Sequence, residues 1–426
     1  MTPIVITAEK PVFGGDSLTW IEGKALFLPG LIPGEVAQVE LVSRQKDYDR
    51  AQVLSILEPS PHRITPACPY YSSCGGCTML HVEGEFQREL RRQVLQDLFQ
   101  REKIVIPAID IVAAETLGYR CRMQLHDGGL LERGKGKAVI PITSCACATA
   151  EINSWLQQIP PEQRAQHHPG RIQIFGDRRV CGGQQVFWAS TQKSQNSLQV
   201  TGKSRRKVQD KVRRRFSGTV ASPATTCTVQ LTPGNCSPKM ISFDVRGFFQ
   251  SNLAVLEQAI TLLLEYVEEI KTATGKSTLA HALDIYSGAG TIAAFLADHF
   301  QMVTLVEHNR DALVFAQQNL MGKAHQSYGV SGEQWAREFA PALLKGNLPE
   351  LAFVDPPRSG MEPAMRRFLA QSGIPRIAYL SCDPATQARD CATLEKAGYR
   401  VKRLFLLDFY PNTGHMEMMA FLEKQI

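Results

Sequence analysis

The chain has 426 residues, of which 44% are hydrophobic and 21% are charged, and its formal net charge is +6. This length is too great for one ordinary hydrophobic core, so two or three domains are expected, and the composition is that of a globular protein rather than a disordered or fibrous one. No apolar run is long enough to span a bilayer and the start lacks a signal-peptide pattern, so we expect a cytoplasmic protein without a membrane partner.

The positive charge is concentrated in the middle of the chain. Residues 1–60 carry a net charge of −3, residues 61–240 carry +12, and residues 241–426 carry −3. Eight of the 13 residues from 203 to 215 are Lys or Arg. A basic excess of this size favours docking of a nucleic acid, although a charge run alone is also typical of a solvated face or a disordered arm.

Residues 1–60 are expected to form a small β domain. Four short apolar runs are separated by turns rich in glycine and proline, a spacing typical of a small barrel of the OB type. The expected strands are Ile4–Ile6, Ala25–Leu28, Val36–Val42 and Ala51–Leu57. Pro59, Pro61 and Pro66 then mark a linker.

Residues 61–240 are expected to form a central α+β domain that contains a cluster of thiols and a helix over 84–102. Three cysteines lie within ten residues and two more follow much later: Cys68, Cys74, Cys77, Cys145 and Cys147. Four thiolates can hold a [4Fe–4S] cluster or a structural zinc ion, and the three-plus-one spacing favours the cluster. The spacing leaves open whether Cys145 or Cys147 is the fourth ligand.

Residues 241–426 are expected to form an α/β domain. A long amphipathic helix begins near residue 253, and strands and helices then alternate, as in a doubly wound parallel sheet. The expected strands are 281–285, 302–306, 351–354 and 376–381, and the expected helices are 291–298, 310–320 and 362–370. Two final strands, Arg400–Asp408 and Met416–Lys424, are expected to close the sheet as an antiparallel pair.

A glycine-rich turn follows the first strand of this domain. Gly288 and Gly290 allow a tight turn and close approach of a ligand, and Glu307 at the end of the next strand can accept hydrogen bonds from ribose hydroxyls. A third glycine, which would admit a pyrophosphate, is absent. The turn therefore favours S-adenosylmethionine over a dinucleotide, while an ordinary tight turn is the simplest alternative.

Four polar side chains fall at expected carboxyl ends of strands, where ligands bind in open α/β sheets. These residues are Tyr286, Glu307, Asp355 and Cys382. A thiolate can add to C6 of a uracil and make C5 nucleophilic, after which a base must remove the C5 proton. Cys382 is our candidate nucleophile and Glu417 our candidate base, with a buried structural cysteine and an exposed strand carboxylate as the simpler alternatives.

Residues 241–426 resemble the RNA uracil-5-methyltransferases that form 5-methyluridine. The matching segments are Phe248-Phe249-Gln250-Ser251-Asn252, Asp284 to Gly290, Asp355-Pro356-Pro357-Arg358, Ser381-Cys382-Asp383-Pro384 and Gly414-His415-Met416-Glu417. The resemblance implies a Rossmann-like class I methyltransferase domain, with Cys382 as nucleophile and Glu417 as base. It also implies that Gln250, Tyr286, Glu307 and Asp355 contact S-adenosylmethionine or the target base. A uracil within folded RNA would have to be flipped out.

The segment from Cys68 to Cys77 is similar to that of one branch of the same family, in which an iron–sulfur motif ends in Cys-Gly-Gly-Cys. This similarity implies Cys68, Cys74 and Cys77 as cluster ligands, with Cys145 fitting the fourth position better than Cys147. Residues 14–58 resemble a TRAM domain, the small RNA-binding barrel that often precedes the cluster. In this family such an arrangement implies bacterial 23S ribosomal RNA as the substrate, with transfer RNA as the alternative, and we expect a monomer.

Three other classes of protein were compared with this interpretation. A redox iron–sulfur protein would explain the clustered thiols but would leave Cys382 and Glu417 without a role. A non-catalytic RNA-binding protein would be expected to lack the thiol, the base or the glycine turn, and all three are present. A cytosine-5-methyltransferase usually places its nucleophile after Pro or Thr, unlike Ser381-Cys382.

Overall fold

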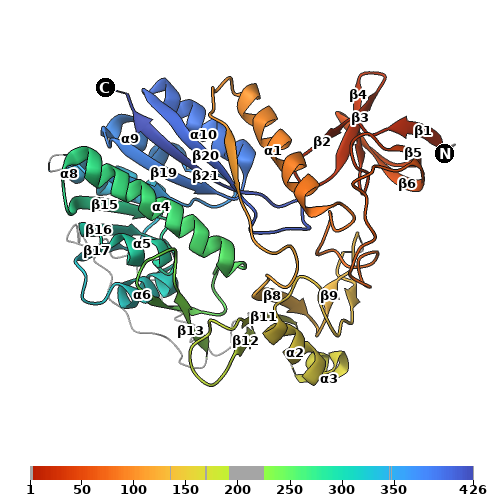
Figure 1. Ribbon diagram of the computed structural model, residues 1–426, viewed down its shortest axis with the longest axis horizontal. Helices are drawn as coiled ribbons and strands as arrows, with labels where there is room; N and C mark the ends of the chain where they lie inside the picture. Colours follow the sequence, from red (N-terminus) through yellow and green to blue (C-terminus); the bar gives the residue numbers. More distant parts are fainter. Residues whose placement is uncertain are drawn as a thin grey trace, which may run out of the picture.

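A computed structural model describes residues 3–134, 136–167, 170–190, 225–344, 346 and 348–425. The basic segment 203–215 lies outside the described residues. In the described part, an N-terminal sheet, a group of small sheets and a large C-terminal sheet follow one another along the chain (Figure 1). No helix in the described ranges is long and apolar enough to cross a membrane.

The large sheet has eight strands in the order β17-β16-β15-β18-β19-β21-β20-β7. Its strands in chain order are β7 (Ile109–Val112), β15 (Leu279–Ile285), β16 (Phe300–Val306), β17 (His325–Tyr328), β18 (Leu351–Val354), β19 (Arg376–Ser381), β20 (Tyr399–Leu407) and β21 (Glu417–Lys424). The strands from β17 to β19 are parallel, and β21 pairs antiparallel with both β19 and β20. The expected mostly parallel sheet with an antiparallel end is therefore confirmed.

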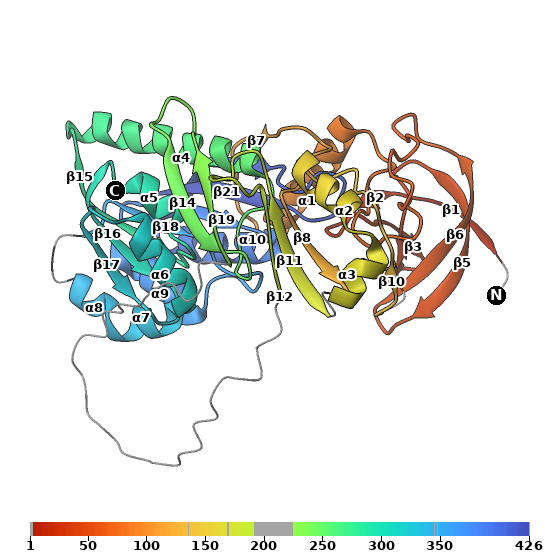
Figure 2. The ribbon, with the colours of Figure 1, turned by 90° about the horizontal axis from the view of Figure 1, so that it is seen from below.

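Successive strand residues point to opposite faces of this sheet, and both faces are apolar. Helices therefore cover both faces. The strand β18 illustrates the alternation: Phe353 packs in the core on one face, and Ala352 and Val354 pack in the core on the other. The first face is covered by α4 (Leu253–Thr274), α5 (Thr291–Leu296) and α6 (Arg310–Asn319). The second face is covered by α1 (Gly84–Arg101), α7 (Gly332–Glu338), α9 (Pro363–Ser372) and α10 (Pro384–Lys396), with the short α8 (Ala340–Leu343) after α7. Figure 2 shows α4 and α7 on opposite sides of the strands.

The N-terminal strands form a six-stranded sheet in the order β1-β5-β6-β4-β3-β2. Its strands are β1 (Ile4–Thr7), β2 (Lys10–Pro11), β3 (Ser17–Ile21), β4 (Lys24–Leu28), β5 (Val36–Arg44) and β6 (Tyr48–Glu58). Leu26, Leu28, Ala37 and Val39 form the centre of its own apolar cluster. The four expected strands are present, and the closure of this sheet into a barrel stays a prediction.

The segment between the two large sheets contains smaller units. A three-stranded sheet packs against the helix α2 (Ala150–Gln158), with Ile152, Leu156, Ile172 and Ile174 buried between them. The strands and the remaining helix here are β8 (Arg122–His126), β9 (Leu130–Leu131), β10 (Val139–Ile140), β11 (Arg171–Gly176), β12 (Val186–Ser190), β13 (Thr226–Leu231), β14 (Lys239–Asp244) and α3 (Pro161–His167).

One strand from this middle segment belongs to the C-terminal sheet, and one helix packs on it. The strand β7 pairs in parallel with β20, and α1 buries Val94, Leu95 and Phe99 against the same face as α9 and α10. In Figure 1, α1 lies between the C-terminal strands and the N-terminal sheet. The helix therefore lies between the C-terminal sheet and the N-terminal sheet and packs on the former (Figure 1).

Candidate active site

One end of the large sheet gathers the polar residues that follow its strands. Tyr286, Glu307, Asp355 and Cys382 come directly after β15, β16, β18 and β19. The strand β21 runs in the opposite direction, so its first residue, Glu417, lies at the same end. Ser381 pairs with Met418, a register that places Cys382 beside Glu417. Topology thus brings together residues spread over more than 130 positions of sequence.

These side chains line one cavity of about 800 Å³. The predicted site residues in its wall are Gln250, Tyr286, Gly288, Glu307, Asp355, Cys382 and Glu417. Gly290 does not line the cavity. It lies just before α5 with φ +72°, and a Cβ there would come within 2.8 Å of the Cβ of Ala316, so the glycine allows the turn to pack against α6.

The glycine turn is held by the acid of the neighbouring strand. The backbone N–H of Gly288 donates to Oε2 of Glu307 at 2.9 Å, and that of Asn309 donates to Oε1 at 2.6 Å. Tyr286 starts the turn in the left-handed region with φ +65°, and its hydroxyl donates to Glu362. Such a conformation is uncommon for a residue with a Cβ and is typical of functional loops.

Buried carboxyl groups give the cavity an unusual proton affinity. Burial, with Glu307 nearby, raises the pKa of Asp355 to about 7. Burial, with Asp355 nearby, raises the pKa of Asp284 to about 8, although the backbone N–H of Ala293 opposes this. Both groups favour their neutral forms when no cation is bound, and a cationic ligand would favour the ionised forms.

The candidate nucleophile and base share this environment. Burial, followed by the nearby Glu417 and Asp355, raises the pKa of Cys382 to about 12, while Arg358 acts in the opposite direction. Burial and Asp355 also raise the pKa of Glu417 well above its ordinary value, again opposed by Arg358. Arg358 therefore favours the ionised forms of both groups.

Several residues in the cavity wall were not selected from the sequence. They are Arg120, Arg122, Phe248, Asp284, Ser287, Glu362, Tyr410 and His415. Among the described residues, none hydrogen-bonds the buried Ser287 Oγ or Gln250 Oε1, which leaves two polar atoms for a ligand. Asp284 and His415 lie inside motifs that the sequence displays. In contrast, Arg122 is the first residue of β8 and Arg120 lies just before it. The strand β8 belongs to a separate sheet, and no strand-end pattern in the sequence predicts that it lies at this site.

A second cavity, of about 260 Å³, is lined by all five clustered thiols, Cys68, Cys74, Cys77, Cys145 and Cys147. We call these five residues the thiol centre. The Sγ atoms of Cys77 and Cys147 are 3.7 Å apart. Asn153 fixes the Cys145 backbone, because its side chain accepts from the Cys145 N–H at 2.8 Å and donates to the Cys145 carbonyl at 3.1 Å.

The thiol centre brings together soft ligands without forming a compact metal-binding group. All eleven cysteines are free thiols, and no set of three or more His, Cys, Asp or Glu within the described ranges is arranged to hold a metal ion. The donor chemistry nevertheless suits a thiolate-bound metal, because sulfur ligands select iron–sulfur clusters and zinc. The backbone N–H of Gly76 also donates to Cys74 Sγ at 3.3 Å.

Comparisons with known proteins agree with this architecture. Residues 239–425 match the family model described as tRNA (Uracil-5-)-methyltransferase. An RNA methyltransferase from Treponema denticola is 30% identical over 99% of both chains. A Halomonas elongata protein named 23S rRNA (uracil(1939)-C(5))-methyltransferase is 29% identical, over 95% of this chain and 86% of its own.

The fold has a close counterpart among solved structures. The Pyrococcus abyssi tRNA (uracil-54, C5)-methyltransferase, solved with S-adenosyl-L-homocysteine, superposes with a TM-score of 0.66 at 21% identity, covering 98% of this chain and 100% of the other. The fold is that of an S-adenosylmethionine-dependent class I methyltransferase. The chain belongs to the RNA uracil-5-methyltransferase family and is an enzyme of that class.

Proposed function

We propose that this enzyme methylates C5 of a specific uridine in RNA through a covalent bond between Cys382 and C6 of the uracil. The observation that carries the proposal is the shared cavity in which Cys382 and Glu417 lie beside the acidic strand ends. A thiol and a carboxyl group in one pocket supply the nucleophile and the base that substitution at C5 requires.

The proposed reaction proceeds in three steps. The Cys382 thiolate adds to C6 of the uracil, and the electrons of the C5–C6 double bond form an enolate. C5 would then form a bond to the methyl carbon of S-adenosylmethionine as the bond between that carbon and the sulfonium sulfur breaks, with S-adenosylhomocysteine as the leaving group. Glu417 removes the C5 proton, the double bond re-forms, and the thiolate of Cys382 is expelled.

Binding of S-adenosylmethionine would favour the ionised forms of the groups that this reaction uses. Without a ligand, the raised pKa values of Cys382 and Glu417 favour their protonated forms near neutral pH. The pKa of Asp355, raised to about 7, leaves this group partly protonated there. The sulfonium and ammonium groups of S-adenosylmethionine are positive and would lower these pKa values. We infer that Gln250, Tyr286, Glu307 and Asp355 bind S-adenosylmethionine or the base.

The glycine turn has two parts in this proposal. Gly288 lines the cavity and would lie against the ligand. Gly290 lies on the side of the turn that packs against α6, so it would allow the turn to adopt its conformation without contacting the ligand.

The proposed substrate is bacterial 23S ribosomal RNA, modified in the cytoplasm by a monomer. The names of relatives that match nearly the whole chain support this choice. Transfer RNA is the second candidate, because the similar Pyrococcus abyssi structure is a tRNA methyltransferase. We infer that the N-terminal sheet is a TRAM-like barrel that contributes to RNA binding.

The thiol centre is proposed to hold a [4Fe–4S] cluster. Cys68, Cys74 and Cys77 would be three ligands, and Cys145 the fourth, supported by the hydrogen bonds that fix its backbone to Asn153. A bound cluster would crosslink the loops that carry these cysteines. Methyl transfer itself involves no change in oxidation state, so a structural role is proposed.

Mass-spectrometric mapping of 5-methyluridine tests the function. Deleting the gene should remove the modification from one site in 23S ribosomal RNA, and the wild-type gene should restore it. Cys382→Ala should fail to restore it, whereas Cys236→Ala, which removes a half-buried thiol outside the cavity, should succeed. Unchanged 5-methyluridine after deletion, or full restoration by Cys382→Ala, would contradict the proposal.

A further inference from the structure

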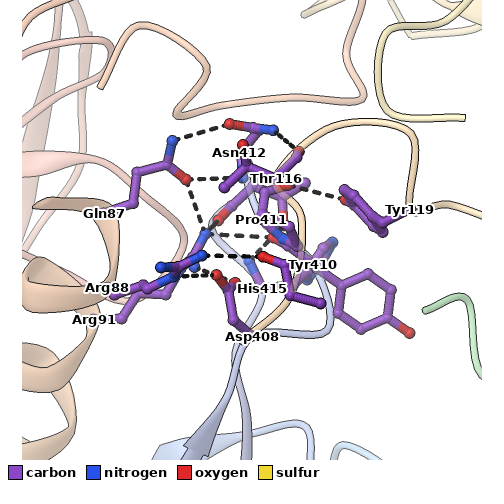
Figure 3. Close-up of polar contacts among 12 residues, drawn as sticks. Gln87, Arg88, Arg91, Thr116, Tyr119, Asp408, Tyr410, Pro411, Asn412 and His415 are labelled. Atoms are coloured by element: carbon purple, nitrogen blue, oxygen red, sulfur yellow. Dashed lines mark hydrogen bonds and ion pairs between the residues drawn. The ribbon is translucent and has the colours of Figure 1, made fainter. Parts of the chain in front are cut away.

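The loop Asp408–His415 connects β20 to β21 and leads directly to Glu417. Tyr410, His415, Met416 and Glu417 all line the active-site cavity. Residues from distant segments hold this loop at almost every position (Figure 3). We call these interactions the loop clamp.

Two arginines of α1 form one side of the loop clamp. Arg91 donates to Oδ1 of Asp408 at 2.7 Å and to the carbonyl of Thr413 at 2.7 Å. Arg88 donates to Oδ2 of Asp408 at 3.0 Å. The side chains of Arg91 and Asp408 are only 5% and 2% exposed, so this ion pair is poorly screened by water. One helix thus fixes both ends of the loop.

Asn412 forms the centre of the loop clamp. It is 3% exposed and adopts φ +66°, a left-handed conformation that Asn tolerates better than most residues. Its N–H donates to Oε1 of Gln87 at 2.8 Å, and its Oδ1 accepts from Nε2 of Gln87 at 3.0 Å. Its Nδ2 donates to the carbonyl of Thr116 at 2.6 Å. Every polar atom of this buried residue therefore has a partner once its carbonyl is included.

The remaining contacts of Asn412 go to Cys147 of the thiol centre and to the two residues that follow Cys77. Its carbonyl accepts from the N–H groups of Thr78 and Met79, both at 3.0 Å, and these residues directly follow Cys77. Its Nδ2 is also 3.7 Å from the Sγ of Cys147. Asn412 therefore contacts one residue of the thiol centre, Cys147, directly, and it also binds the backbone segment next to a second, Cys77.

The N-terminal sheet closes the loop clamp from a third direction. A Cβ at Gly414 would lie 2.0 Å from the backbone of Gly14, between β2 and β3. A Cβ at Gly15 would meet Thr78, Met79 and Gly414 within 3.2 Å. The backbones of Gly14 and Gly414 touch here, and the side chains of Thr78 and Met79 pack against Gly15, so a shift of one region would displace the others.

We infer that Asn412 is a positioning residue through which the thiol centre holds Glu417 in place for the removal of the C5 proton. This inference rests on the proposed function. When a cluster is bound, its ligands Cys77 and Cys145 are fixed, and Cys147 is held between them because it lies two residues from Cys145 and its Sγ is 3.7 Å from that of Cys77. The contacts of Asn412 with Cys147 and with the segment after Cys77 then hold the loop in place. When the thiol centre is empty, the loop loosens and Glu417 loses its alignment while the strand-end acids that would bind S-adenosylmethionine stay in place.

Kinetics of Asn412→Gly give the first test. Glycine keeps the left-handed backbone and removes the side-chain bonds to Gln87, Thr116 and Cys147. We expect kcat to fall between about tenfold and a hundredfold, because small misplacement of a catalytic group has effects of this size. The KM for S-adenosylmethionine should change less than about twofold, since Asn412 does not line the cavity. Lys103→Gly, a change to glycine at another left-handed residue, in the exposed turn after α1, should leave both constants unchanged.

Hydrogen exchange gives a second test that needs no activity. Wild-type protein reconstituted with iron and sulfide should protect the amides of 408–417, and stripping with a chelator and an oxidant should remove that protection. In Asn412→Gly these amides should exchange rapidly in both states, while the amides of β15 and β16 stay protected throughout. Equal protection of 408–417 in loaded and stripped wild-type protein would overturn the inference.

The two proposals fail in different ways. Wild-type enzyme that forms no 5-methyluridine in any RNA contradicts the proposed function, whatever the exchange data show. Wild-type enzyme that methylates uridine while Asn412→Gly keeps a normal kcat contradicts the positioning role alone. A fall in kcat matched by an equal rise in the KM for S-adenosylmethionine would also contradict it, because the cofactor site itself would then be damaged.

Discussion

Cys382 and Glu417 are neighbours at the end of the sheet, and both are protonated more readily than in water. Burial is the main cause, and the carboxyl groups around them add to it. Arg358 is the nearby positive group that opposes the effect. Its Nη2 is also 3.3 Å from Nδ1 of His415, whose pKa is lowered by burial and by Arg358. Because a neutral imidazole carries no charge, Arg358 can stabilise the ionised forms of Cys382 and Glu417.

Glu417→Gln separates the two halves of the proposed reaction. Glutamine cannot accept the C5 proton, so the methylated adduct should persist as a covalent complex between the enzyme and RNA, and turnover should fall about 10²- to 10⁴-fold. A denaturing gel with labelled RNA measures the complex. Glu423→Gln, on the same strand but outside the cavity, should turn over normally and give no stable complex. Normal turnover by Glu417→Gln would show that another group removes the proton.

The carboxyl end of the large sheet is the element that assembles the site. Parallel strands place their following residues together, and the reversed strand β21 contributes its first residue at the same end. Asp284, Glu307 and Asp355 consequently share a buried region, where, after burial itself, Glu307 raises the pKa of Asp355, and Asp355 and Glu307 raise the pKa of Asp284. The ligand-free enzyme therefore loses stability as the pH rises through the raised pKa values of Asp284 and Asp355.

Asp355→Asn should remove the loss of folding stability that ionisation of Asp355 causes in the ligand-free enzyme. The folded pKa of Asp355 is raised from 3.8 to about 7, so its contribution to stability is present at low pH and is lost as the pH rises through 7. The variant should match wild type at about pH 4 and exceed it at about pH 8 by up to about 4 kcal/mol. Denaturant unfolding at both pH values measures the difference.

Asp298→Asn provides a control of opposite sign for this experiment. Burial of Asp298 is outweighed by its ion pairs with Lys239 and Lys323, so its pKa is lowered. This variant should lose stability relative to wild type as the pH rises. An Asp355→Asn variant that is no more stable than wild type at about pH 8 would contradict the buried-acid account.

The sequence predicted the strand ends well because each was marked locally. An apolar run followed by a polar motif identifies a strand and its end, and the parallel arrangement then places Glu307, Asp355 and Cys382 together. The antiparallel end that brings in Glu417 followed from two apolar runs near the C-terminus. Five thiols in two short segments likewise indicated one centre, and all five line one cavity.

At the scale of the whole molecule, the three regions meet at the loop 408–415. The ion pairs of the loop clamp join residues more than 300 positions apart, and Gly414 touches Gly14 across almost the full length of the chain. Contacts of this kind have no periodicity or spacing in the sequence. For the same reason, β7 and α1 were expected in the central domain although they pack on the C-terminal sheet.

Trapping with 5-fluorouridine tests the central claim most directly. Fluorine at C5 cannot be removed as a proton, so a reaction that passes through the Cys382–C6 adduct should stop there after methyl transfer. Ribosomal RNA transcripts containing 5-fluorouridine, incubated with enzyme and S-adenosylmethionine, should give a covalent complex whose crosslinked peptide contains Cys382. Formation of 5-methyluridine from normal transcripts, with no adduct on Cys382 from fluorinated ones, would contradict the account.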